Sequence, residues 1–147
     1  MYYYANELRL ELPGLSSDRT LNVLGINDPQ SQRPVQLVIN RDLLIGGETL
    51  EQCFERQLNL LKREAQQFKL HQRLAIEAGS AKLKGIELES SFIISGKAHH
   101  QLQAIIELQA PKLLTLTMSA PGAVDESMRA LWRKVLTSIE PWQPPRQ

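Results

Sequence analysis

Apolar residues recur at every second position over most of this chain, and this alternation constrains the fold more than any other feature. A period of two is typical of β-strands that bury one face. The alternating segments are bounded by turn-forming pairs such as Pro13-Gly14 and Ser95-Gly96. They predict strands at residues 8–12, 20–26, 34–42, 68–76, 86–94, 102–108 and 114–118.

Two further segments show helical spacing instead. Thr49 and Gln52 fit a capping box at the start of the first helix, which we expect to end near Gln66. Asp125 is a good N-cap for the second helix, and Pro141 follows its end. The apolar stripe of the first helix is Leu50, Cys53, Phe54, Leu58, Leu61 and Ala65, and that of the second is Met128, Leu131, Trp132, Val135 and Ile139.

The order of these elements predicts the α+β class, with an antiparallel sheet flanked by helices. The strands from residue 86 to residue 118 are expected to form an antiparallel meander. The alternation of strands and helices that a Rossmann-type fold requires is missing. At 147 residues, without an internal repeat or linker, the chain is expected to fold as a single domain spanning residues 1–147.

The charge balance and the cysteine count limit the partners and the compartment. The chain contains 17 lysines and arginines and 16 acidic residues, so its net charge is close to zero. This charge balance does not favour binding to nucleic acid or to an anionic membrane. A single cysteine cannot form an intrachain disulfide, which suits a reducing compartment. No apolar run approaches the roughly 20 residues of a membrane helix. The first residues lack the pattern of a signal peptide, so we expect a cytoplasmic protein without stable membrane association.

No sequence motif points to catalysis. Residues 79–85 contain glycine and lysine but lack the order of a phosphate-binding loop. His99 and His100 are neighbours on a strand and point to opposite faces, and the cysteine lies on a helical apolar stripe. Glu87 and Glu89 are expected to be exposed surface carboxylates. The sequence therefore predicts no catalytic residue, no metal and no cofactor, and an enzyme is the least favoured reading.

The two faces of the predicted strands differ in composition. One face is fully apolar and is expected to lie beneath the helices: Val35, Leu37, Ile39, Leu102, Ala104, Ile106, Leu114, Leu116 and Met118. The other face mixes aliphatic, amide and hydroxyl groups and has few charges: Gln36, Val38, Asn40, Gln101, Gln103, Ile105, Glu107, Leu113, Thr115 and Thr117. A solvated face usually carries more lysine and glutamate. Since threonine also favours strands for other reasons, a binding face and an ordinary exposed face both stay open.

Gln57 is unusual because it interrupts the apolar stripe of the first helix between Cys53 and Leu61. A buried amide requires a hydrogen-bond partner. We therefore expect this side chain either to bond within the fold or to reach a ligand.

Short blocks distributed over nearly the whole chain resemble the effector-associated Eag chaperones of the bacterial type VI secretion system, a branch of the DcrB-like family. The matching blocks are residues 21–23, 37–42, 55–58 and 68–71, together with the proline-rich end. The resemblance implies a Mog1/PsbP-like fold, a homodimer, and an open concave sheet face. That face holds the N-terminal transmembrane helices of effectors, which carry a PAAR domain and in some cases Rhs repeats. The chaperone keeps these helices soluble in the cytoplasm and aids loading onto the spike protein VgrG.

The resemblance also implies which residues bind the effector. The apolar part would comprise Leu21, Val23, Val38, Leu61 and Ile105, and the polar part Gln36, Asn40, Gln57 and Gln103. Family members often carry serine at the positions of Gln36 and Asn40. The alternative is a Mog1-like regulatory or structural module that binds a folded protein, which a charged outer face would favour.

Overall fold

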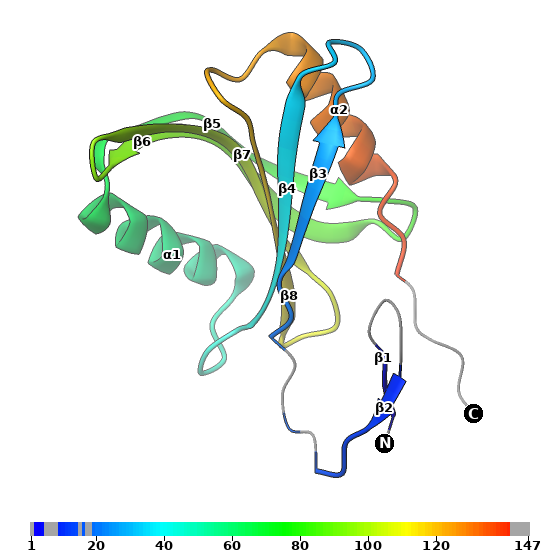
Figure 1. Ribbon diagram of the computed structural model, residues 1–147. Coiled ribbons are helices and arrows are strands. Elements are labelled where there is room, and N and C mark those ends of the chain that lie inside the picture. Colours follow the sequence, from blue (N-terminus) through cyan, green and yellow to red (C-terminus); the bar gives the residue numbers. More distant parts are fainter. Residues whose placement is uncertain (1, 5–8, 15, 17–18, 142–147) are drawn as a thin grey trace.

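Figure 1 shows the computed structural model, which describes residues 2–4, 9–14, 16 and 19–141. Its elements are β1 (Tyr2–Tyr4), β2 (Arg9–Glu11), β3 (Asn22–Asn27), β4 (Pro34–Leu43), α1 (Leu50–Glu64), β5 (Gln66–Ala78), β6 (Leu83–Ile94), β7 (Lys97–Glu107), β8 (Lys112–Ser119) and α2 (Glu126–Thr137). Each predicted helix and strand has a counterpart. Strand β1 was not predicted, and Leu8 of the predicted first strand lies outside the described residues.

Six strands form one antiparallel sheet in the order β3-β4-β8-β7-β6-β5. Strands β5 to β8 follow one another as a meander, as predicted for the later part of the chain. Strands β1 and β2 pair only with each other. The structure confirms the predicted α+β class with an antiparallel sheet flanked by helices.

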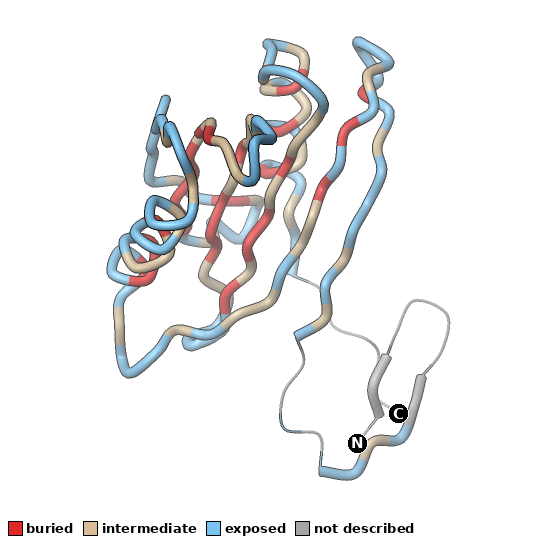
Figure 2. Tube along the Cα trace, turned by 60° about the vertical axis from the view of Figure 1, so that its left-hand side comes forward, coloured by how far each residue is buried: buried red, intermediate tan, exposed pale blue. Residues whose placement is uncertain are grey.

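The two helices cover opposite faces of the sheet (Figures 1 and 2). Helix α2 packs on the fully apolar face through Met128, Trp132 and Leu136. Helix α1 packs on the other face through Leu50, Cys53, Phe54 and Leu58, which contact Ile86, Leu88, Ile105 and Leu113. The expectation that one face lies beneath both helices was therefore wrong. Below, the two faces are called the α1 side and the α2 side.

Local chemistry sets the start of each helix as the sequence predicts. At α1, Gln52 N donates to Thr49 Oγ1 at 3.2 Å, and Thr49 N donates to Gln52 Oε1 at 2.9 Å, which completes the capping box. At α2, Met128 N donates to Asp125 Oδ1 at 2.8 Å. These bonds satisfy amides that have no partner within the helix.

Glu87 and Glu89 of β6 are not the exposed carboxylates that the sequence suggested. Glu87 is 6% exposed and accepts hydrogen bonds from Trp132 Nε1 at 2.9 Å and Arg133 Nη2 at 2.7 Å. Arg129 donates to both carboxylate oxygens of Glu89, at 2.8 and 3.0 Å, and lowers the pKa of that carboxyl group. Both carboxylates therefore fasten α2 to the sheet.

Candidate functional site: an open sheet face beside helix α1

The α1 side of the sheet is only partly covered by its helix. Helix α1 lies over β6, the adjoining part of β7 and β8 at Leu113, and the same side of β3, β4 and the rest of β8 carries no helix (Figure 1). We call this uncovered surface the open face. It consists of Val23, Gly25, Gln36, Val38, Asn40, Gln101, Gln103, Thr117 and Ser119, all exposed or half-buried.

The strand register arranges the open face in rows. One row runs from Val23 of β3 through Val38 and Thr117 to Gln103 of β7. A second row runs through Gly25, Gln36, Ser119 and Gln101 in the same order of strands. Aliphatic groups thus gather toward β3 and amides toward α1. None of these residues carries a formal charge, and the acids Asp42 of β4 and Glu107 of β7 lie further along the same side of the sheet, both half-buried.

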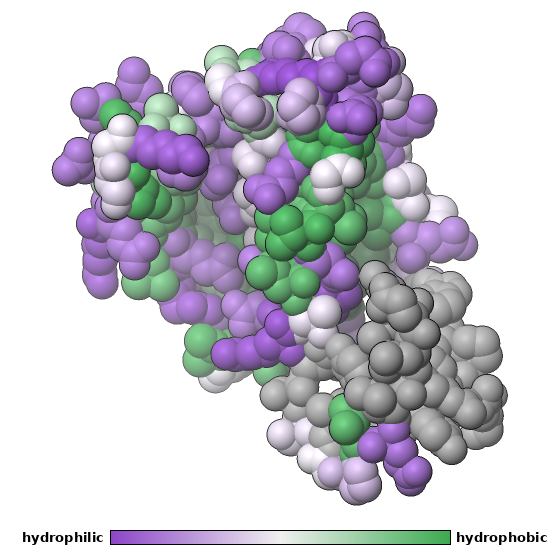
Figure 3. Space-filling model, in the orientation of Figure 1, coloured by the Kyte–Doolittle hydropathy of each residue, from purple (hydrophilic) through white to green (hydrophobic). Residues whose placement is uncertain are grey.

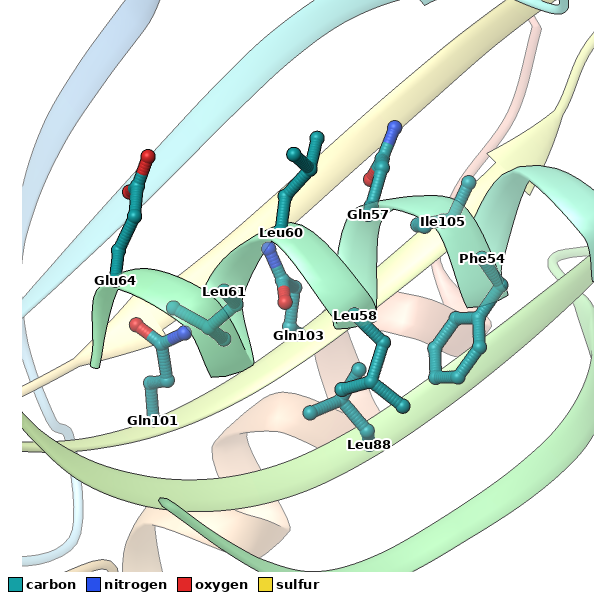
Figure 4. A pocket seen from close by; sticks show the side chains of 10 residues that line it. All are labelled: Phe54, Gln57, Leu58, Leu60, Leu61, Glu64, Leu88, Gln101, Gln103 and Ile105. Carbon is teal, nitrogen blue, oxygen red and sulfur yellow. The ribbon is translucent and has the colours of Figure 1, made fainter. Parts of the chain in front are cut away.

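A pocket of about 370 Å³ lies where the open face meets α1. Figure 4 shows Gln57, Leu60 and Glu64 along one side of the helix, with the amides of Gln101 and Gln103 rising from β7 nearby. The pocket is completed by Phe54, Leu58, Leu61, Leu88 and Ile105. Figure 3 shows the recess between α1 and the apolar side chains that gather over β3.

The amides in and near the pocket retain unused hydrogen-bonding capacity. Gln57 Nε2 donates to Cys53 Sγ at 3.5 Å, and Gln103 Nε2 donates to Thr117 Oγ1 at 3.3 Å. Sulfur is a weak acceptor, and each amide offers two donor hydrogens and a carbonyl acceptor. The hydroxyl of Ser90, across the strands from Gln101, is buried and has no partner among the described residues. Such a surface can accept apolar groups and also satisfy polar ones.

The structure places all of the predicted binding residues on the α1 side. Gln57, Leu61, Gln103 and Ile105 line the pocket. Val23, Gln36, Val38 and Asn40 lie on the adjoining open face, and Leu21 directly precedes β3 in alternation with Val23. Ile105 is 2% exposed because α1 packs over it, so it forms the floor of the pocket rather than a free contact surface.

Sequence reasoning did not select several residues of this site. Leu60 and Glu64 lie about one and two turns beyond Gln57 on the same side of α1, and helical spacing could have indicated them. Ser119 joins the face only because it pairs with both Gln36 and Gln101, a relation that requires the strand order.

The described residues show no sign of metal chemistry or of a membrane span. No group of three or more histidine, cysteine, aspartate or glutamate side chains in residues 19–141 is placed to hold a metal ion. No helix within the described ranges is long and apolar enough to cross a membrane. His99 is half-buried against Phe92, with ring centroids 5.3 Å apart. Cys53 is fully buried, and burial raises the pKa of its thiol.

Residues 7–138 match the DcrB family, so the chain belongs to that family. Effector EagT6 of Pseudomonas aeruginosa is 25% identical over 140 residues, which is 95% of this chain and 94% of that protein. The resemblance to Eag proteins within the DcrB family is thereby confirmed.

One solved structure shows a similar fold over the whole chain. The crystal structure of PA94 from Pseudomonas aeruginosa, a putative regulator of unknown function, has a TM-score of 0.76 at 22% identity and covers 98% of both chains. LpqN, involved in cell envelope biogenesis of Mycobacterium tuberculosis, has a TM-score of 0.49 at 15% identity and covers 86% of this chain and 84% of its own.

Proposed function

We propose that this protein is a chaperone for effectors of the type VI secretion system, and that it binds their N-terminal transmembrane helices on the open face. The observation that carries the proposal is a sheet face with few charges, which combines aliphatic groups with amides of unused hydrogen-bonding capacity beside the α1 pocket. The similarity to Effector EagT6 supports an effector-associated role. We assign the protein a binding role rather than a catalytic one.

A transmembrane helix exposes a large apolar surface when it is in water. Each square ångström of apolar surface that is covered contributes about 25 cal/mol, so a helix of about 20 apolar residues gains strongly from a partner. Val23, Val38 and the leucines of α1 supply apolar contacts. Gln36, Asn40 and Gln103 can bond to backbone carbonyls that small residues leave accessible, as polar side chains do between membrane helices.

The resemblance to Eag chaperones also suggests a compartment, an oligomeric state and a class of clients for this protein. We propose that the protein acts in the cytoplasm as a homodimer, that its clients carry a PAAR domain and in some cases Rhs repeats, and that it delivers them to VgrG. Release needs no nucleotide, since a lipid bilayer or a membrane partner binds the same helices more favourably. A Mog1-like module for a folded partner would favour a charged surface, whereas the α1 side of the sheet carries few charges.

Co-expression with the N-terminal region of a PAAR effector encoded nearby, followed by size-exclusion chromatography, tests this function. We expect a stable complex that keeps the effector segment soluble. The matched control is the same effector without its transmembrane helices, which should remain soluble alone and should not co-elute. An effector segment that stays insoluble, or a control that binds equally well, would contradict the proposal and favour a folded partner.

A further inference from the structure

The pocket beside α1 is more enclosed than the rest of the open face. Helix α1 forms one wall, and strands β6 and β7 form the floor through Leu88 and Ile105 (Figure 4). Its volume of about 370 Å³ lies within the range of about 300–1,000 Å³ that is typical of small-molecule sites. A helix that contacts the open face only through small side chains would leave this space to water. The pocket therefore suits one large side chain of an occupant.

The floor and the inner wall of the pocket are apolar. Phe54, Leu58, Leu88 and Ile105 line the pocket and are each at most 6% exposed. These side chains pack against one another, so they present a fixed surface of one aromatic ring and three aliphatic groups. An aromatic side chain buries about 150–250 Å², which makes it the occupant that gains most from a broad apolar surface.

The rim of the pocket carries polar side chains that lack strong partners. The Glu64 carboxylate and the Gln101 amide make no hydrogen bond or ion pair with any residue in the described part of the chain. The Gln57 amide donates only to the sulfur of Cys53, which is a weak acceptor. These groups are therefore available to an occupant that brings a polar atom to the rim.

Ser90 provides an independent observation beside the pocket. Its hydroxyl is buried and has no partner among the described residues, which is rare for a buried polar group. Leu88 lies two positions before it on the same side of β6, and Gln101 lies directly opposite on β7. The Cβ atoms of directly opposed residues are about 4.5–5.5 Å apart. The Gln101 amide N–H can therefore donate to this hydroxyl while its carbonyl oxygen accepts a bond from an occupant.

We infer that the α1 pocket receives a tryptophan side chain of the client helix, whose indole N–H donates to the Gln101 carbonyl oxygen. This inference rests on the proposed function, because it names the side chain by which the client is held. An indole has a large apolar ring and a single donor, which match an apolar floor below a rim of acceptors. Leucine or phenylalanine would leave the rim unpaired. Lysine would pair with Glu64 but would leave much of the apolar floor uncovered.

A tryptophan in this pocket would also fix the position of the client along the open face. The two rows of the open face offer similar aliphatic and amide groups, so a smooth helix could slide along them. One large side chain in one pocket removes that freedom. Tryptophan suits this role because it is common at the ends of membrane helices and among the residues that dominate binding energy.

The first test is an NMR titration of the full chain, without any effector, with N-acetyl-L-tryptophanamide as the probe. One matched probe is methylated at the indole nitrogen and so lacks the donor, and another is N-acetyl-L-lysinamide. We expect saturable shifts at the methyl groups of Leu61 and Ile105, and binding of the methylated probe that is weaker by about 2- to 10-fold. No saturable shift with the tryptophan probe, equal binding of the methylated probe, or tighter binding of the lysine probe would overturn the inference.

The second test identifies the acceptor of the indole N–H. Gln101→Leu removes the amide at nearly constant size, and Gln109→Leu makes the same change at an exposed position between β7 and β8. We expect Gln101→Leu to bind the tryptophan probe and its methylated analogue equally well, and Gln109→Leu to keep the wild-type preference. Circular dichroism checks that both variants are folded. A preference that persists in Gln101→Leu would refute the assigned hydrogen bond.

The two proposals fail separately. A protein that binds the tryptophan probe in the pocket but does not solubilise an effector contradicts the proposed function and leaves the pocket inference intact. A chaperone that keeps its client soluble but shows no preference for the indole N–H contradicts only the pocket inference.

Discussion

The indole Nε1 of Trp132 donates a hydrogen bond of 2.9 Å to the carboxylate of Glu87, and this contact ties α2 to strand β6 across the sheet face. Both residues are almost fully buried. Arg133 donates to the second carboxylate oxygen, so the buried charge has a hydrogen bond on each side. A buried carboxylate is tolerated when it is paired and bonded in this way.

Trp132→Phe should therefore lower the free energy of unfolding by about 1–3 kcal/mol, since it leaves a carboxylate oxygen of Glu87 without its donor. Urea denaturation measures the change. A double-mutant cycle with Glu87→Gln separates the hydrogen bond from the lost ring volume. Lys134→Gln on the exposed side of α2 is the control and should change stability by less than about 0.5 kcal/mol. A coupling energy near zero would contradict the role assigned to this bond.

Charges on the open face should abolish client binding. Replacing Leu21, Val23 and Val38 with glutamate introduces charges that a bound apolar helix would desolvate. We expect loss of effector pull-down with an unchanged far-ultraviolet circular dichroism spectrum. Leu43→Glu is the control, because Leu43 is 47% exposed on the α2 side of β4 opposite Lys112, and this variant should bind normally. Retained effector binding by the triple variant would show that the open face is not the binding site.

Glu48 should contribute to acid stability. Its hydrogen bonds with Arg56, at 2.9 and 3.2 Å, and with the amide of Ile45 lower its pKa from 4.5 to about 2. Because the folded-state pKa is depressed, the contribution is complete above pH 4.5 and is lost as the pH falls toward 2. Denaturation at a series of pH values should show Glu48→Gln to be less stable than wild type at pH 7. The two should converge near pH 2, and parallel pH profiles would argue against this effect.

Gly79 and Gly96 offer a matched test of backbone crowding. Both have a positive φ, +69° and +76°, and either change to alanine should cost about 1–2 kcal/mol for that reason alone. A side chain at Gly79 would also collide with the carbonyl group of Ile139, whereas one at Gly96 meets nothing within 4 Å. Gly79→Ala should thus lose clearly more stability in urea denaturation. Equal losses would mean that the segment after α2 moves aside at little cost.

Local sequence patterns predicted the elements well because their causes are local. The capping box at Thr49 and the N-cap at Asp125 depend on residues a single turn apart. The period of two located the strands, although the first short strand at Tyr2–Tyr4 was missed. The composition of the α1 side, with its amides and hydroxyls, could likewise be read from alternation along each strand.

The position of α1 could not be derived in that way. An apolar stripe shows that a helix is buried, but not against which face of the sheet. Ile105 and Leu113 were the available signal, because large aliphatic groups on an otherwise polar face need a cover. The exposure of Glu87 and Glu89 was predicted wrongly for the same reason. Both carboxylates are covered because α2 crosses their side of β6.

The sequence by itself determined the location of both helices and of the seven strands from β2 to β8, which side chains share a strand face, and that one face would carry few charges. Only the tertiary structure decided the rest. Strand order brought Gln36, Ser119 and Gln101 into one row, and the packing of α1 turned part of the face into a pocket. The strand order also placed β3 at one edge of the sheet. The reason is physical: periodicity records contacts along one segment, whereas rows, pockets and edges arise from segments that meet only after folding.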